Sequence, residues 1–289
     1  MEISLLLATF FLWTILAASA QIGSRAAIPV ASGKSTALPG NTDSVSAGLS
    51  GPGPDLQILI TGLETAQHVN RAHMVPFTVT REYELFRGEN REAMGTVVVE
   101  VHFQPPATKT WIIKKTSGSG RAETVVKNVL EREVNWARDS RSAIGRQNYD
   151  FQFVGSGETD RRPCYILELI PKRADSDLLR GRIWVDRDTY LIHRFEGTPA
   201  KNPSWWLKDV KISSSYGELG GIWLPTNSKG LADVRLIGPH TMTERTLSYR
   251  AGRTVVEGPA ADMMRLARAQ NSSSYRPSAT VGVSIIGPR

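Results

Sequence analysis

The chain has 289 residues, and its 35 lysines and arginines against 28 acidic residues give a formal net charge of +7. This charge favours contact with anionic surfaces such as phospholipid headgroups, although it also promotes solubility without any partner. The single cysteine, Cys164, excludes an internal disulfide and any metal site built from several cysteines. Its neighbours Tyr165 and Ile166 predict a buried structural thiol rather than a nucleophile.

Residues 1–20 have the features of a secretory signal peptide. An apolar run over residues 5–18 is short for a membrane span, and it ends in Ala18-Ser19-Ala20, a small-x-small cleavage pattern. Residues 1–4 contain no Lys or Arg, so an uncleaved amino-terminal anchor is the alternative. We predict cleavage after Ala20 and a periplasmic mature protein, for which nucleic acid is not an expected partner.

Two further segments have the composition of flexible chain. Residues 21–54 are rich in Ser, Gly, Ala, Pro and Thr, and they cannot bury enough apolar surface to offset the entropy lost on ordering. Residues 258–289 are similar. We therefore predict a flexible leader at 21–54, one folded domain at 55–257 and a flexible tail at 258–289.

Two segments of the domain have apolar residues at helical spacing. Asp55 is suited to cap a helix that runs to about Asn70, and a second helix is expected over residues 121–138. In the second helix, Glu131, Arg132 and Glu133 are expected on the solvent side. Each helix has one apolar stripe, so each is expected to lie against a sheet rather than inside a core.

About eleven segments alternate apolar and polar residues as strands do. They are residues 75–86, 97–103, 109–115, 149–153, 163–171, 179–186, 190–196, 205–216, 221–229, 231–237 and 241–250. The turns between them are short, which predicts hairpins and an antiparallel meander. An antiparallel sheet of this size must curl, close or split. The predicted fold is mainly β (α+β), a strongly curved antiparallel sheet or incomplete β-barrel capped by the two helices.

The order of motifs in residues 149–225 carries a resemblance to a known family. A strand ends in Pro171-Lys172, a spacer leads to Trp184-Val185-Asp186, and a tight turn precedes a strand with the basic residue Arg194. This order resembles the periplasmic lipoprotein-sorting superfamily, which includes the LolA and LolB carriers and the sensor domain of RseB. The resemblance covers roughly residues 55–250.

The resemblance implies an incompletely closed antiparallel barrel whose helices cover its open side. It also implies reversible binding of acyl chains or other apolar groups in the concave cavity, without a cofactor and without catalysis. In the carriers, a basic residue before a proline at the end of the second strand helps to hold a helical lid closed. Here Gln104 precedes Pro105, so the basic residue of that latch is missing. We therefore expect a member of the broad superfamily rather than a true lipoprotein carrier.

The concave face of the sheet is the predicted ligand cavity. Its candidate lining residues are large apolar side chains of the inward strand faces and of neighbouring strands: Val97, Val99, Val101, Phe103, Trp111, Tyr149, Phe151, Phe153, Trp184 and Trp223. For any single tryptophan, ordinary core packing is the competing interpretation, because aromatic side chains dominate protein cores. No metal site and no cofactor are expected.

Three hypotheses about function follow. The leading one is a periplasmic, monomeric carrier or chaperone that binds a lipid or an acylated lipoprotein and contacts the anionic membrane surface peripherally. The alternative is an RseB-like sensor that binds an envelope protein and has no transport role. The third is a hydrolase that uses His193 and Asp186. No Gly-x-Ser-x-Gly elbow or His-rich metal spacing supports it, so we predict a protein that is not an enzyme.

Overall fold

The computed structural model describes residues 54–88, 92–137 and 142–258. The expected signal peptide, nearly all of the expected leader and most of the expected tail lie outside the described residues. Two helices are described, α2 (Leu56–Ala72) and α3 (Gly120–Ala137). The strands are β1 (Phe77–Arg87), β2 (Gly95–Gln104), β3 (Thr108–Gly118), β4 (Tyr149–Thr159), β5 (Arg162–Pro171), β6 (Leu179–Asp186), β7 (Ile192–Pro199), β8 (Leu207–Leu219), β9 (Ile222–Val234), β10 (Gly238–Ala251) and β11 (Thr254–Glu257).

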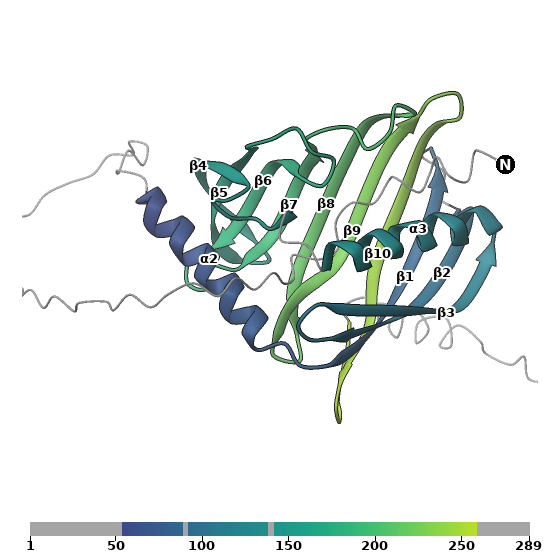
Figure 1. Ribbon diagram of the computed structural model, residues 1–289, viewed down its shortest axis with the longest axis horizontal. Helices are drawn as coiled ribbons and strands as arrows, with labels where there is room; N and C mark the ends of the chain where they lie inside the picture. The colour runs from purple at the N-terminus through teal and green to yellow at the C-terminus, as the bar shows by residue number, and fades with distance from the viewer. Residues whose placement is uncertain (1–53, 89–91, 138–141, 259–289) are drawn as a thin grey trace, which may run out of the picture.

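These strands form one antiparallel sheet that curves without closing (Figure 1). The strand order is β3-β2-β1-β10-β9-β8-β7-β6-β5-β4, and β11 pairs with β10. The chain returns from β9 to β10, which pairs with β1 over ten register positions from Thr78↔Arg250 to Arg87↔His240. Strands β3 and β4 are left as the two outer strands. The prediction of a curved, open antiparallel sheet of about eleven strands with two helices is therefore confirmed.

One detail of the strand prediction is wrong. Residues 221–229 and 231–237 were expected to form two strands, but β9 runs continuously through Gly230. The glycine is paired on both sides, with Ile212 of β8 and with Met242 of β10. Neighbouring strands thus keep the backbone extended where the local sequence favours a break. The eleventh strand is instead β11, a segment of four residues that the alternation did not indicate.

The core lies on the inner face of the sheet, beneath the helices. Side chains of β1 and β2 alternate strictly between buried and partly exposed positions, as expected of strands with one face covered. Helix α3 contacts β1, β2 and β3, and it buries an apolar stripe that is at most 2% exposed: Ala122, Val125, Val126, Val129 and Leu130. Both helices therefore lie against the sheet, as their single apolar stripes predict.

Helix α2 begins where the sequence predicts. The carboxylate of Asp55 accepts hydrogen bonds from the backbone N–H groups of Gln57 and Ile58 at 2.8 and 3.3 Å, so it satisfies two donors that the first turn leaves free. Leu59 and Leu63 are buried, whereas Ile58 is 64% exposed. The helix thus covers one part of the core and presents apolar side chains outward as well. Within the described residues, no helix has the length and apolar character that a membrane span requires.

Candidate ligand-binding groove

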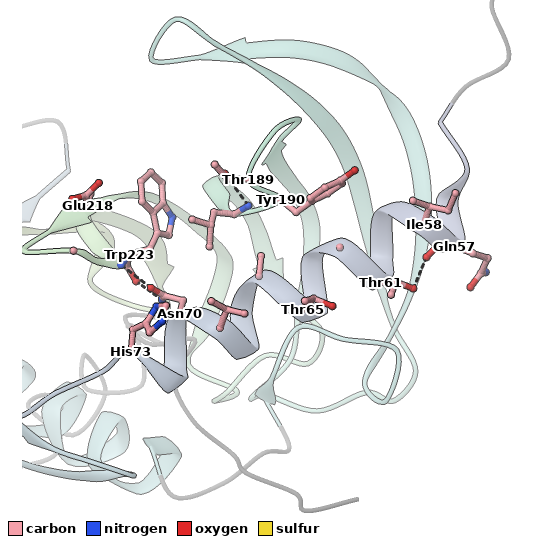
Figure 2. Close-up of a pocket in the computed structure, with 15 residues that line it drawn as sticks. Gln57, Ile58, Thr61, Thr65, Asn70, His73, Thr189, Tyr190, Glu218 and Trp223 are labelled. Carbon is pink, nitrogen blue, oxygen red and sulfur yellow. Dashed lines mark hydrogen bonds between the residues drawn. The ribbon is translucent and has the colours of Figure 1, made fainter. Parts of the chain in front are cut away.

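A pocket of about 830 Å³ lies between α2 and two hairpin turns at one end of the sheet (Figure 2). We call it the α2 groove. One wall is α2, and the other consists of the β6–β7 turn and the β8–β9 turn. Its lining residues are Gln57, Ile58, Thr61, Gly62, Thr65, Ala66, Val69, Asn70, His73, Thr189, Tyr190, Leu191, Glu218, Gly221 and Trp223.

The β6–β7 turn is shaped by the buried carboxylate of Asp186. This carboxylate accepts hydrogen bonds from the backbone N–H groups of Asp188 and Thr189 at 2.9 and 2.8 Å. Burial opposes the ionisation of Asp186, but these hydrogen bonds, with those from the Thr189 hydroxyl and Arg162, outweigh burial and hold its pKa below the usual value. The turn carries Tyr190 in a left-handed conformation, with φ of 57°. A local Asp-capped turn therefore delivers an aromatic ring to the groove.

Tyr190 reaches the helix because α2 has a glycine opposite to it. A Cβ atom on Gly62 would lie 2.7 Å from the Tyr190 ring, closer than any ordinary contact. Glycine in the middle of a helix destabilises it by roughly 0.5–1 kcal/mol relative to alanine. Here the absent side chain allows the Tyr190 ring of the second wall to pack closely against the helix.

The second wall is held by a double hydrogen bond between α2 and β9. The Asn70 side chain donates to the backbone oxygen of Trp223 and accepts from its backbone N–H, both at 2.8 Å (Figure 2). The Trp223 indole N–H donates to the backbone oxygen of Ile192 at 2.7 Å. Its ring lies 4.5 Å from that of His193, centroid to centroid. These contacts fix the position of the Trp223 ring beside the helix.

The exposed surface of the α2 groove is mainly apolar. Ile58, Ala66, Val69, Leu191 and the two aromatic residues supply its apolar surface, and Val69 is 45% exposed. The amide of Asn70 is already occupied by Trp223. Ligand pockets are typically about 300–1,000 Å³ with a mostly apolar surface, and the volume and the mainly apolar surface of this groove match both features.

The ten residues predicted to line a cavity are mostly elsewhere. Of the ten, Trp223 lines the α2 groove. Eight others belong to the inner face of the sheet, where they are buried or pack against the buried core: Val97, Val99, Val101, Phe103, Trp111, Tyr149, Phe151 and Phe153. Val101 and Phe103 border a void of only about 10 Å³. Trp184 follows the buried Ile183 in β6. The guanidinium of Arg194 lies over the Trp184 ring, 5.1 Å from the ring centroid.

Sequence reasoning missed the contribution of α2 to the groove. The available signal was the pair of apolar residues, Ile58 and Val69, that fall outside the buried stripe of the helix. The β6–β7 turn was recognised as a turn, but its proximity to α2 depends on contacts between residues far apart in the chain.

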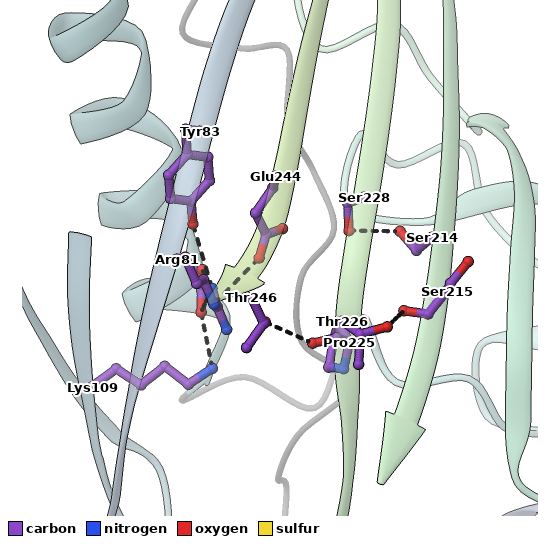
Figure 3. Close-up of polar contacts among 11 residues, drawn as sticks. Arg81, Tyr83, Lys109, Ser214, Ser215, Pro225, Thr226, Ser228, Glu244 and Thr246 are labelled. Atoms are coloured by element: carbon purple, nitrogen blue, oxygen red, sulfur yellow. Dashed lines mark hydrogen bonds and ion pairs between the residues drawn. The ribbon is translucent and has the colours of Figure 1, made fainter. Parts of the chain in front are cut away.

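A buried polar cluster joins α3 to the sheet (Figure 3). Glu133 of α3 accepts hydrogen bonds from Arg81 of β1 at 3.0 Å and from Lys109 of β3 at 3.3 Å. Arg81 Nε also lies 3.3 Å from a carboxylate oxygen of Glu244 on β10. The expectation that Glu133 faces solvent is wrong, because its side chain is 4% exposed. The pairing with two buried cations turns it inward.

Burial dominates the pKa values of two residues in this cluster, Lys109 and Glu244. It lowers the pKa of Lys109 to about 8, although the charge of Glu133 acts in the opposite direction. It raises the pKa of Glu244 to about 7, against the attraction of Arg81 and with the support of the negative charge of Glu133. The Arg81 guanidinium remains protonated because its pKa is raised by Glu133 and Glu244, which outweigh burial.

The other candidate groups have structural environments. His193 Nε2 lies 3.4 Å from Asp186 Oδ2, and both side chains are buried. The carboxylate of Asp186 is used by the backbone of the β6–β7 turn. The prediction that Cys164 is buried is confirmed, and burial raises the pKa of its thiol. Among the described residues, no group of three or more His, Cys, Asp or Glu side chains is placed to hold a metal ion.

Comparisons with known proteins yield limited matches. A family model described as that of an uncharacterized protein matches residues 138–235, and a comparison with curated proteins finds no match. Among solved structures, the chain is similar to a DUF1329 family protein from Desulfovibrio piger, with 15% identity and a TM-score of 0.34. That match covers 68% of this chain and 94% of the other.

Two further solved structures resemble the chain. A LolA superfamily protein from Nitrosomonas europaea has 12% identity and a TM-score of 0.34, over 68% of this chain and 94% of that one. The MucA/MucB complex of Pseudomonas aeruginosa has 12% identity and a TM-score of 0.22, over 73% of this chain and 96% of that one. The superfamily that the sequence motifs resemble is thus represented among the matches.

Proposed function

We propose that this protein is an exported, periplasmic binder of an apolar ligand, and that the α2 groove holds the ligand. The observation that carries the proposal is a preformed pocket of about 830 Å³ whose exposed surface is mainly apolar. The sequence hypothesis put the ligand on the concave face of the sheet. Eight of the ten candidate residues are buried in the core or packed against it, which favours the rim of the sheet instead.

The charges around the groove indicate which part of a ligand it recognises. Its lining residues include one carboxylate, Glu218, and one imidazole, His73, but no lysine or arginine. A phosphate or carboxylate headgroup would therefore find no cation among them to pair with. This absence favours recognition of the alkyl or other apolar portion of a lipid or acylated protein, with the headgroup directed to solvent.

The walls are rigid enough to present the groove before a ligand arrives. The Asp186-capped turn fixes Tyr190, and the double hydrogen bond of Asn70 fixes Trp223. A preformed site avoids part of the entropy cost of ordering side chains on binding. The role in the envelope would be that of a carrier or chaperone, with an RseB-like sensor of an envelope protein as the alternative.

The proposal is tested by filling the groove. Thr65 lines it and is exposed, so Thr65→Trp should occlude the groove without disturbing the core. His68 is exposed on the same helix but does not line the groove, so His68→Trp is the matched control. The measurement is the affinity for a fluorescent fatty-acid analogue, together with mass spectrometry of lipids that co-purify with the protein.

We expect the dissociation constant to rise at least about tenfold in Thr65→Trp, a loss of about 1.4 kcal/mol of binding free energy, and to stay unchanged in His68→Trp. Failure of the wild-type protein to bind any alkyl probe would refute the proposal. Equal binding by both variants would place the ligand outside the groove. Capture of a defined envelope protein that Thr65→Trp abolishes, without lipid binding, would favour the sensor alternative.

A further inference from the structure

The end of the sheet opposite to the α2 groove has an exposed apolar tip. It is formed by Trp205 and Trp206 in the β7–β8 loop and by Leu236 in the β9–β10 turn, and we call these three residues the tryptophan tip. Trp205 is 68% exposed and Leu236 is 91% exposed. In Figure 1 the β7–β8 loop and the β9–β10 turn lie at the same end of the sheet, at the top of the view.

The two segments of the tip are tied together by Arg235. Its backbone N–H donates to the carbonyl oxygen of Trp206 at 2.8 Å, and its Nε donates to the carbonyl oxygen of Trp205 at 2.7 Å. The two indole rings lie against each other with centroids 3.7 Å apart. The apolar side chains are therefore displayed on a braced surface that extends beyond the ends of the strands.

The conformation of Leu236 argues that its side chain is there for an intermolecular contact. Its φ is 73°, in the left-handed region that glycine, asparagine and aspartate tolerate best in turns. A leucine at this position strains the backbone and exposes nearly its whole side chain to water. Neither effect stabilises the turn. Contact with a partner that covers the side chain would explain why a leucine occupies this position.

Cations surround the tip. Lys201, Lys208 and Arg235 are exposed, and none of the three makes an ion pair with another described residue. The acids of the same segments are Asp209 and Asp233, and Asp233 lies opposite Lys208 in the β8–β9 register. Three positive charges against two negative ones leave an excess of one at the tip, in a chain of net charge +7.

We propose that the tryptophan tip docks this protein on an anionic phospholipid bilayer, with its apolar side chains in the interfacial region. Tryptophan is suited to this region because one part of the indole is apolar and its N–H is polar. The cations would contact the headgroups, each strengthening binding about fivefold at an anionic surface. A narrow, projecting tip can enter the headgroup layer, and its cations match the negative charge of that surface.

The tip and the α2 groove are separate sites. Strand β8 has 13 residues and connects them, starting beside Trp206 and ending beside the lining residue Glu218. At about 3.3 Å per residue, this separation is about 40 Å. Docking by the tip would hold the groove away from the bilayer surface. The inference therefore goes beyond the proposed function and does not rest on it.

Vesicle co-sedimentation tests the inference on the full chain. The wild-type protein should bind vesicles of phosphatidylglycerol and phosphatidylethanolamine, and bind phosphatidylcholine vesicles more weakly. Leu236→Asn suits the positive φ and Trp205→Ser alters an exposed side chain, so the double variant should fold normally. Ile112→Ser, at a β3 residue that is 54% exposed, is the matched control.

We expect the double variant to lose about tenfold or more in vesicle affinity, because it removes apolar surface that enters the interface. Lys201→Gln should lose about fivefold, and only with anionic vesicles. Ile112→Ser and Thr65→Trp should bind vesicles as the wild type does. Absence of wild-type binding at low salt would overturn the inference. Undiminished binding by the double variant would overturn it as well.

Discussion

The buried cluster around Glu133 makes a strong prediction about stability. Replacing Glu133 by alanine leaves two buried cations, Arg81 and Lys109, with Glu244 as the one carboxylate of the cluster. Removing one partner of a buried ion pair typically costs about 3–5 kcal/mol, because the remaining charge is uncompensated in a site of low polarity. We expect a loss of this size in the free energy of unfolding of the Glu133→Ala variant.

The low pKa of Lys109 limits the loss of stability in the Glu133→Ala variant. Burial already lowers it to about 8, and Glu133 acts against that shift. Without Glu133 the pKa falls further, so Lys109 can release its proton near neutral pH and avoid being a buried unpaired charge. The loss should therefore be larger at acidic pH than at alkaline pH, since protonating Lys109 in the variant restores the uncompensated cation.

Urea denaturation, followed by circular dichroism and by tryptophan fluorescence, measures the effect. Glu123→Ala is the control on the same helix, because Glu123 makes an exposed ion pair with Lys127 at 2.7 Å. Exposed pairs are screened by water and salt, so this control should change stability little. A loss for Glu133→Ala no larger than that for Glu123→Ala would refute the reasoning.

A second comparison separates charge from packing. Glu133→Gln keeps the size of the side chain and should still be strongly destabilised. Adding Lys109→Met to Glu133→Gln removes one charge of each sign and leaves Arg81 with Glu244. The double variant should regain part of the stability, because residues in one ionic network do not act additively. Strictly additive losses would show that the charges are not coupled.

Two further predictions concern Glu244 and Asn70. The folded-state pKa of Glu244, about 7, lies above its unfolded value. The stability that Glu244 contributes is therefore present at acidic pH and is lost as pH rises through about 7. The Glu244→Gln variant should not show this loss of stability with rising pH. Urea midpoints of both proteins at about pH 5 and about pH 8 check it, and a stability difference that is the same at both pH values would contradict it. Asn70→Ala removes two hydrogen bonds to Trp223 and should cost about 1–3 kcal/mol, with weaker alkyl-probe binding, whereas His68→Ala should do neither. Unchanged probe binding in Asn70→Ala would show that the position of Trp223 does not matter to the groove.

Local pattern was sufficient for much of the fold. Strict alternation identified β1 and β2, because strands with one covered face place successive side chains on opposite sides. Asp55 marked the start of α2, since a helix N-terminus has unpaired N–H groups that a carboxylate can satisfy. Short turns predicted antiparallel pairing. Each of these inferences depends on residues within a few positions of one another.

Other features depended on partners that are distant in the chain. Gly230 interrupts the sequence pattern of β9, yet two neighbouring strands hold it extended. Glu133 has the sequence position of a solvated helix residue, but Arg81, which lies 52 residues earlier, and Lys109 bind it inside the core. Local hydrophobic spacing cannot reveal such a pairing, because a charged side chain is buried only when its counter-charge is placed by the rest of the fold.

The amino-acid sequence by itself determined the strand alternation, the helix start, the curved antiparallel class and the buried cysteine, because these follow from short-range periodicity and turn chemistry. Only the tertiary structure decided which apolar surfaces remain uncovered. The inner face of the sheet is covered by its own helices, so large inward side chains become core. The open apolar surface arises at the rim, where Asn70 meets Trp223 across 153 residues of chain. Periodicity specifies which side chains share a face, but the packing of distant elements specifies which faces remain uncovered.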